Sequence, residues 1–141
     1  MYEKFGQFID GNWSPSSNKE TYEVINPATE EDLGNASKAT PTDVDRALKS
    51  AEKGLTIWRK TPPWQRAYTL RKIADKVREK KDVLAKWMTL ENGKPLVEGI
   101  GETNGAADIF EWNSEETKRI YGQIVESRFP NARVMLAGKE V

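Results

Sequence analysis

The stretch TPTDVDRALKSAEKGLTIW, residues 40–58, is where the sequence pattern changes from strand-like to helical. Thr40 suits the N-cap of a helix, Pro41 suits its first position, and Asp43 stands three residues after the cap, as in a capping box. Apolar residues then recur at steps of three and four, at Val44, Ala47, Leu48, Ala51, Leu55 and Trp58. This spacing predicts an amphipathic helix whose apolar face must be covered by another surface.

Two more helical patterns follow toward the C-terminus. One begins at Thr61-Pro62-Pro63 and continues to about Leu90, where Asn92-Gly93-Lys94-Pro95 ends it. The next runs from about Leu96 to Tyr121 and has an unusually glycine-rich beginning. The sequence therefore predicts three main helical segments.

Short strand patterns flank these helices. Asp10-Gly11 between two apolar runs predicts an N-terminal β-hairpin. Thr21–Ile25 predicts a strand and Leu33–Ala39 its return strand, whereas residues 123–130 look irregular and Arg133–Val141 predicts a terminal strand. Because such short strands need a partner surface, we expect the fold to which they belong to be incomplete in this sequence.

The composition excludes several kinds of chemistry. The 141 residues include no Cys and no His, so the chain has no thiol nucleophile, no thiolate zinc site and no imidazole base. Its 22 basic residues balance 22 acidic ones, which argues against a nucleic-acid or membrane-surface partner. The sequence has neither a signal-peptide pattern nor an apolar run of about 20 residues. We therefore expect a cytoplasmic protein with no nucleic-acid and no membrane partner.

Two motifs invite functional interpretations that their context does not favour. Gly99-Ile100-Gly101-Glu102-Thr103-Asn104-Gly105 looks like a phosphate-binding loop, but its spacing is wrong and no strand precedes it. Gly101 and Gly105 instead share one helical face that admits either another helix or a ligand channel. The basic stretch Arg71–Lys81 has its charges between apolar positions, which favours a solvated helix face over a nucleic-acid site.

Several segments occur in an order typical of one family: VINPAT at residues 24–29, TLENGKPL at 89–96 and KRIYG at 118–122. Together with the Phe-Ile-Asp-Gly-x-Trp motif at residues 8–13, they make the whole chain resemble an aldehyde dehydrogenase. This resemblance implies an incomplete α/β fold of the aldehyde dehydrogenase kind. Within that superfamily, the pattern of residues 110–122 is most similar to succinate-semialdehyde dehydrogenases. Such enzymes oxidise an aldehyde to a carboxylate through a cysteine thiohemiacetal, with hydride transfer to NAD or NADP.

The resemblance also implies that most of the enzyme lies outside this sequence. The family's oxyanion-hole Asn, cofactor loop, general-base Glu and nucleophilic Cys all follow the point where this sequence ends. We therefore expect an N-terminal fragment, inactive alone and binding no cofactor itself, of a homo-oligomeric enzyme. Its expected parts are a strand-rich arm at residues 1–39, a helical part at 40–122 and, at 123–141, the start of an oligomerisation strand region.

Five residues receive site roles from the resemblance. Many family members hold a structural monovalent or divalent cation on backbone carbonyls beside the Asn-Pro segment and on an acid before Asn-Gly-Lys, here Val24, Ile25 and Glu91. The alternative is that Glu91 is simply a helix-end acid and Ile25 a strand residue. The aldehyde tunnel of the family implies lining roles for Gly101 and Gly105. Related succinate-semialdehyde enzymes carry a larger residue at the position of Gly105, so this glycine departs from their pattern.

Two rival functions fit other features of the sequence. A stand-alone helical interaction module would use the apolar stripes of residues 44–58 and 97–120 and would form a stable monomer or closed oligomer. A nucleic-acid binder would use Arg71–Lys81 and would show salt-dependent affinity, which the zero net charge disfavours.

Overall fold

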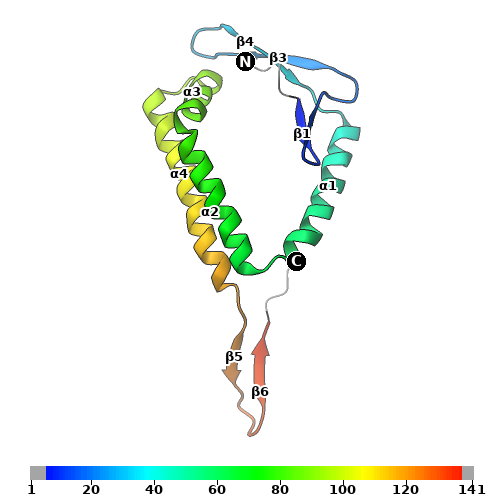
Figure 1. Ribbon diagram of the computed structural model, residues 1–141, viewed down its shortest axis with the longest axis vertical. Coiled ribbons are helices and arrows are strands. Elements are labelled where there is room, and N and C mark those ends of the chain that lie inside the picture. Colours follow the sequence, from blue (N-terminus) through cyan, green and yellow to red (C-terminus); the bar gives the residue numbers. More distant parts are fainter. Residues whose placement is uncertain (1–5, 138–141) are drawn as a thin grey trace.

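The computed structural model describes residues 6–137. Two helical limbs stand apart at a strand-rich end and converge at the opposite end, beyond which a β-hairpin projects (Figure 1). The elements in chain order are β1 (Gln7–Ile9), β2 (Asn12–Ser14), β3 (Thr21–Ile25), β4 (Asp32–Ser37), α1 (Pro41–Lys60), α2 (Pro63–Glu79), α3 (Lys81–Asn92), α4 (Leu96–Glu116), a 3₁₀ turn (Thr117–Arg119), β5 (Gln123–Glu126) and β6 (Arg133–Leu136).

The N-terminal strands form two separate antiparallel pairs. In the first, Phe8 pairs with Trp13 across a turn at Asp10 and Gly11, which both have positive φ, as a type I′ hairpin requires. The second pair joins β3 to β4, with a bulge between Val24 and Ile25. The hairpin, strand and return strand predicted from the sequence are all confirmed.

Helix α1 begins where the sequence predicted. Thr40 caps it, and the reciprocal hydrogen bonds of a capping box with Asp43 are both present. In Figure 1 α1 forms one limb and α2 and α4 the other. The apolar stripe of α1 is solvent-exposed, with Val44 at 50%, Leu48 at 60% and Leu55 at 48% of full exposure.

The second predicted helix is wrong as a single element. The chain breaks at Lys80, which has φ −99° and ψ 10° and separates α2 from α3. The polar run Glu79-Lys80-Lys81-Asp82 interrupts the apolar stripe there, and the break lets both helices pack against α4. The third predicted helix is confirmed as α4, although its last turn is a 3₁₀ turn.

The C-terminal region also differs from the prediction. Residues 123–126 form strand β5, where the sequence looked irregular, and they pair with β6 through contacts such as Val125 with Val134. A strand of four residues is too short to show a clear alternation of apolar and polar side chains, so only its pairing with β6 identifies it as a strand. The predicted terminal strand is confirmed for Arg133–Leu136, and its end, residues 138–141, lies outside the described residues.

Small side chains make the tightest contacts in the helical part. The apolar side chains that are buried among the described residues are all alanines: Ala67, Ala74, Ala85 and Ala107. The chain exposes 11121 Å², whereas a compact 16.0 kDa monomer exposes about 7400 Å². Large apolar surfaces of the helices and of the β5–β6 hairpin therefore face solvent.

Candidate functional site

The turn between α3 and α4 is shaped by Gly93. This residue ends α3 in the left-handed conformation, with φ 76°, and its N–H donates to the Thr89 carbonyl at 2.9 Å. Lys94 Nζ then forms an ion pair with Glu102 at 2.6 Å, and Pro95 precedes the first turn of α4. The helix-stop chemistry predicted for Asn92-Gly93-Lys94-Pro95 is confirmed.

A second tight turn follows β3. Asn26 is buried, and its Oδ1 accepts a hydrogen bond from the Ala28 N–H at 2.9 Å. The Asn26 N–H donates to the Glu31 carbonyl, and the Asn26 carbonyl accepts from the Glu30 N–H. These bonds fix the Asn-Pro segment directly after the Val24–Ile25 bulge.

The structure brings these two turns into contact. A Cβ built on Gly93 would stand 3.0 Å from Pro27 Cγ and 3.8 Å from Ala28 Cβ. Val24 and Ile25 therefore end a strand beside the turn that follows Glu91. No group of three or more acidic, His or Cys residues suited to a metal occurs in residues 6–137. A cation here would need backbone carbonyls besides any carboxylate, and such oxygen donors suit hard cations.

Gly101 and Gly105 lie on an open side of α4. A Cβ on either residue would meet no atom within 4 Å among the described residues. The close approach between helices occurs instead at Gly99, where a Cβ would stand 2.9 Å from the Ala85 carbonyl oxygen. Sequence reasoning missed Gly99, although Gly99, Thr103 and Ala107 form a row of small buried residues at four-residue spacing.

The glycine-rich motif forms no phosphate loop. Residues 99–105 lie inside α4, which runs from Leu96 to Glu116, so their backbone N–H groups belong to a helix interior rather than to a turn. The arrangement of strand, turn and helix N-terminus that a nucleotide phosphate needs is therefore absent from this motif. The described residues thus give no fit for a dinucleotide at this position.

The acidic residues of α4 hold α2. Arg71 pairs with Glu111 and Glu115, and Arg78 pairs with Asp108 and Glu111. The hydrogen bond from Arg78 lowers the pKa of the Glu111 carboxyl, and that from Lys118 lowers the pKa of the Glu115 carboxyl. Both carboxyls therefore stay ionised and serve as structural anions rather than as proton donors.

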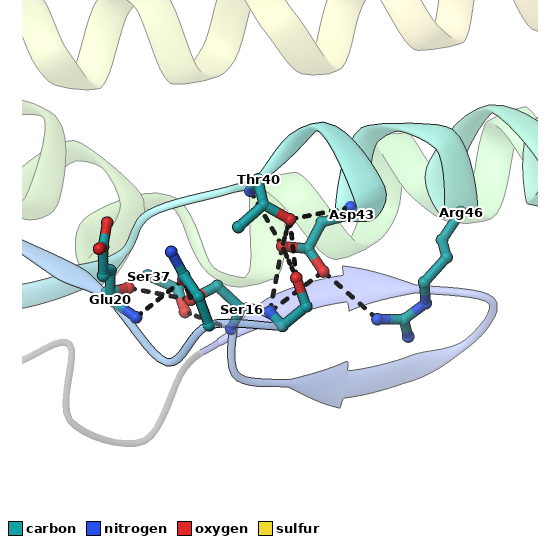
Figure 2. A network of polar contacts seen from close by, with 8 residues as sticks. Ser16, Glu20, Ser37, Thr40, Asp43 and Arg46 are labelled. Carbon is teal, nitrogen blue, oxygen red and sulfur yellow. Dashed lines mark hydrogen bonds and ion pairs between the residues drawn. The ribbon is translucent and has the colours of Figure 1, made fainter.

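Figure 2 shows the polar cluster that ties the N-terminal arm to α1. The Asp43 carboxylate is buried and accepts hydrogen bonds from the backbone N–H groups of Ser17, at 3.1 and 3.2 Å, and Thr40, at 3.0 Å. These donors, the Thr40 N–H foremost, lower the pKa of Asp43 to about 2. Ser16 extends the cluster: its backbone N–H donates to Ser37 Oγ at 3.1 Å, and its hydroxyl donates to the Glu20 carbonyl at 3.0 Å.

This cluster links the N-terminal arm to the start of α1 through Ser17 and Asp43. The capping box within it was predicted from the sequence. The contact with Ser17 was not predicted, because no local sequence pattern indicates a hydrogen bond between residues 26 positions apart.

None of the described helices is long and apolar enough to cross a membrane.

Comparison with known proteins places these features in a family. The model of the aldehyde dehydrogenase family matches residues 13–139. The chain is 40% identical over 129 residues to a glutarate-semialdehyde dehydrogenase of Pseudomonas aeruginosa, covering 92% of this chain and 27% of that protein. It is 38% identical over 128 residues to the NADP-dependent succinate-semialdehyde dehydrogenase of Escherichia coli, covering 91% of this chain and 27% of that protein.

Solved structures agree with these matches. The crystal structure of succinate-semialdehyde dehydrogenase from Burkholderia pseudomallei superposes with a TM-score of 0.87 at 36% identity, covering 94% of this chain and 27% of that one. The chain thus spans about 27% of the length of these relatives.

Proposed function

Because the chain belongs to the aldehyde dehydrogenase family, we propose that it forms the N-terminal part of an NAD- or NADP-dependent dehydrogenase that oxidises a semialdehyde. The observation that carries this proposal is the 40% identity to a glutarate-semialdehyde dehydrogenase. The relatives named for succinate semialdehyde point to the same substrate class, an aldehyde with a carboxylate at its other end.

In this proposal the covalent chemistry belongs to residues outside the 141. The sequence holds no Cys, so its own residues supply no thiol for a thiohemiacetal. NAD or NADP would accept the hydride at a site outside these residues. What this part contributes is shape: helix α4 along the substrate path and the β5–β6 hairpin for association with other subunits.

The open side of α4 is proposed to line the aldehyde tunnel. Gly101 and Gly105 are four residues apart, so they lie on one face, and nothing in the described chain fills the space beside them. Two glycines leave room for a substrate that larger side chains would exclude. This role is distinct from that of Gly99, which faces α3.

The contact between the Asn-Pro turn and the α3–α4 turn is proposed to support a structural cation. Backbone carbonyls of Val24 and Ile25 and the carboxylate of Glu91 would be its ligands. The neighbouring contact of Gly93 with Pro27 supports this arrangement, because it holds the end of β3 beside the end of α3.

A chimera tests the proposed function. Residues 1–141 replace the corresponding part of the Pseudomonas aeruginosa glutarate-semialdehyde dehydrogenase, and NAD(P)H formation is followed with glutarate semialdehyde, succinate semialdehyde and acetaldehyde. We expect turnover that favours the semialdehydes. Gly105→Phe should lower kcat/KM for the semialdehydes severalfold, while the matched Gly54→Ala on α1 should leave it unchanged. A soluble, folded chimera with no aldehyde-dependent NAD(P)H formation would contradict the proposal.

The rival function, a stand-alone helical interaction module, makes the opposite prediction for the isolated chain. It requires a stable monomer or a closed oligomer that melts sharply. The exposed faces of α1 and α4 do not favour it, because a self-sufficient module covers most of its large apolar residues.

A further inference from the structure

A groove runs along α2 where this helix meets α3. Its floor is apolar and consists of Ile73, Val77 and Leu84, and its rim carries Lys72, Lys76 and Lys80. The groove has a volume of about 490 Å³, within the range of small-molecule sites. It lies outside the turns and the glycine face described above.

The basic residues of the stretch 71–81 fall into two sets that face different parts of the structure. Arg71 and Arg78 turn toward α4 and pair with its acidic residues. Lys72 and Lys76 stand four residues apart on one stripe of α2, and Lys80 follows at the break between α2 and α3, at the end of the groove. The arginines thus have a structural role that the lysines do not share.

The charge of the rim is only partly compensated. Lys76 pairs with Glu79, but both side chains are mostly exposed, at 69% and 60%, and such a pair is weak. Lys72 Nζ lies 4.5 Å from the centroid of the Tyr68 ring, a contact that leaves its positive charge in place. Three ammonium groups against one carboxylate leave the rim positive.

We propose that this groove binds an anionic amphiphile, a carboxylate on an alkyl chain of medium length. The alkyl chain would lie on Ile73, Val77 and Leu84 while the carboxylate meets the lysine rim. Long lysine side chains suit this role, because their methylene stems extend the apolar wall and their ammonium groups stay in water. A nucleic acid fits less well, because the floor offers no aromatic ring for base stacking.

Fluorescence titration tests the proposal. The 141-residue chain, dilute enough to suppress association, is titrated with dansylaminoundecanoate, a fluorescent carboxylate on an alkyl chain of medium length. Val77→Trp fills the floor without changing charge, and Lys72→Glu/Lys76→Glu/Lys80→Glu reverses the rim. Each should weaken binding at least tenfold. Lys49→Glu/Lys53→Glu/Lys60→Glu on α1 makes the same change of charge away from the groove and should weaken it less than twofold.

Competition and folding controls complete the test. Dodecanoate should displace the probe, whereas dodecanol should not, because it lacks the charge. Circular dichroism establishes that each variant is folded, and Val77→Leu serves as a milder filling variant if Val77→Trp is not. Three results would each overturn the proposal. They are an equal loss of probe affinity in the α1 and groove charge variants, unchanged probe affinity in a folded Val77 variant, and displacement of the probe by dodecanol as effective as that by dodecanoate.

Discussion

Gly99 of α4 lies directly against the backbone of Ala85 in α3, so that a Cβ at position 99 would stand 2.9 Å from the Ala85 carbonyl oxygen and 3.2 Å from Thr89 Oγ1. Backbone cannot move aside as a flexible side chain can. The contact shows why α3 and α4 pack closely: the residues buried between them are small, so the two backbones can approach each other. It also separates the glycines of α4 by role, since Gly101 and Gly105 meet nothing in the described chain.

Gly99→Ala should therefore destabilise the protein. Overpacking at a close helix contact costs about 1–3 kcal/mol, which outweighs the better helix propensity of Ala. Gly101→Ala is the matched control, because its Cβ points into open space; it should stabilise the helix by up to about 1 kcal/mol. Urea unfolding of both variants measures the difference. Equal stability of the two variants would show that Gly99 is not a packing residue.

The Asp43 cluster predicts a pH dependence of stability. The pKa of Asp43 is lowered from 3.8 to about 2 by hydrogen bonds, chiefly from the Thr40 N–H, so folding favours the ionised form. The stabilisation is then complete above pH 4 and is lost as the pH falls toward 2. Asp43→Asn should lose this contribution. The difference in the free energy of unfolding between wild type and Asp43→Asn should therefore shrink as the pH falls from 4 toward 2.

Asp45→Asn serves as the control for the Asp43 experiment, because Asp45 is an exposed carboxylate on the same helix. Urea unfolding at several pH values between 2 and 7 measures both variants. A gap between wild type and Asp43→Asn that stays constant from pH 5 to pH 2 would contradict the assignment.

The proposed cation site predicts an ion-dependent melting temperature. In the chimera, addition of K⁺, Na⁺ or Mg²⁺ should raise the Tm, because an ion that binds the folded state stabilises it by mass action. Glu91→Gln should weaken this protection for the ion that binds. Glu98→Gln, a nearby exposed acid in the first turn of α4, should not. Unchanged ion dependence in Glu91→Gln would favour the helix-end role of Glu91.

The local elements were predictable because their patterns are local. The capping residues Thr40 and Asp43 predict the helix start within four residues, and Asp10-Gly11 predicts the hairpin turn. The break at Lys80 was missed because helical periodicity continues on both sides of it. Strand β5 was missed because only its pairing with β6 distinguishes it.

The site residues were predictable only in part. The contact of Gly93 with Pro27 joins positions far apart in the sequence, so no local pattern contains it and it is seen only in the structure. The roles of Gly99 and of the Arg71–Glu111 pair depend on how α2, α3 and α4 pack together. No single helix pattern contains that information.

We propose that the exposed apolar faces of α1, α4 and the β5–β6 hairpin are contact surfaces of a larger aldehyde dehydrogenase fold. The chain exposes 11121 Å², an excess of about 3700 Å² over a compact monomer of its mass. A typical protein interface takes about 800 Å² from each partner, so this excess is large enough for several contacts. Unpaired strand edges in β5 and β6 add a further route to association.

Sedimentation velocity of the isolated 141-residue chain over a wide concentration range, with thermal unfolding in parallel, tests whether these faces need partners. We expect species that grow with concentration and a broad thermal transition, because these surfaces lack their partners. A single 16.0 kDa species at every concentration, melting in one sharp transition, would contradict this proposal.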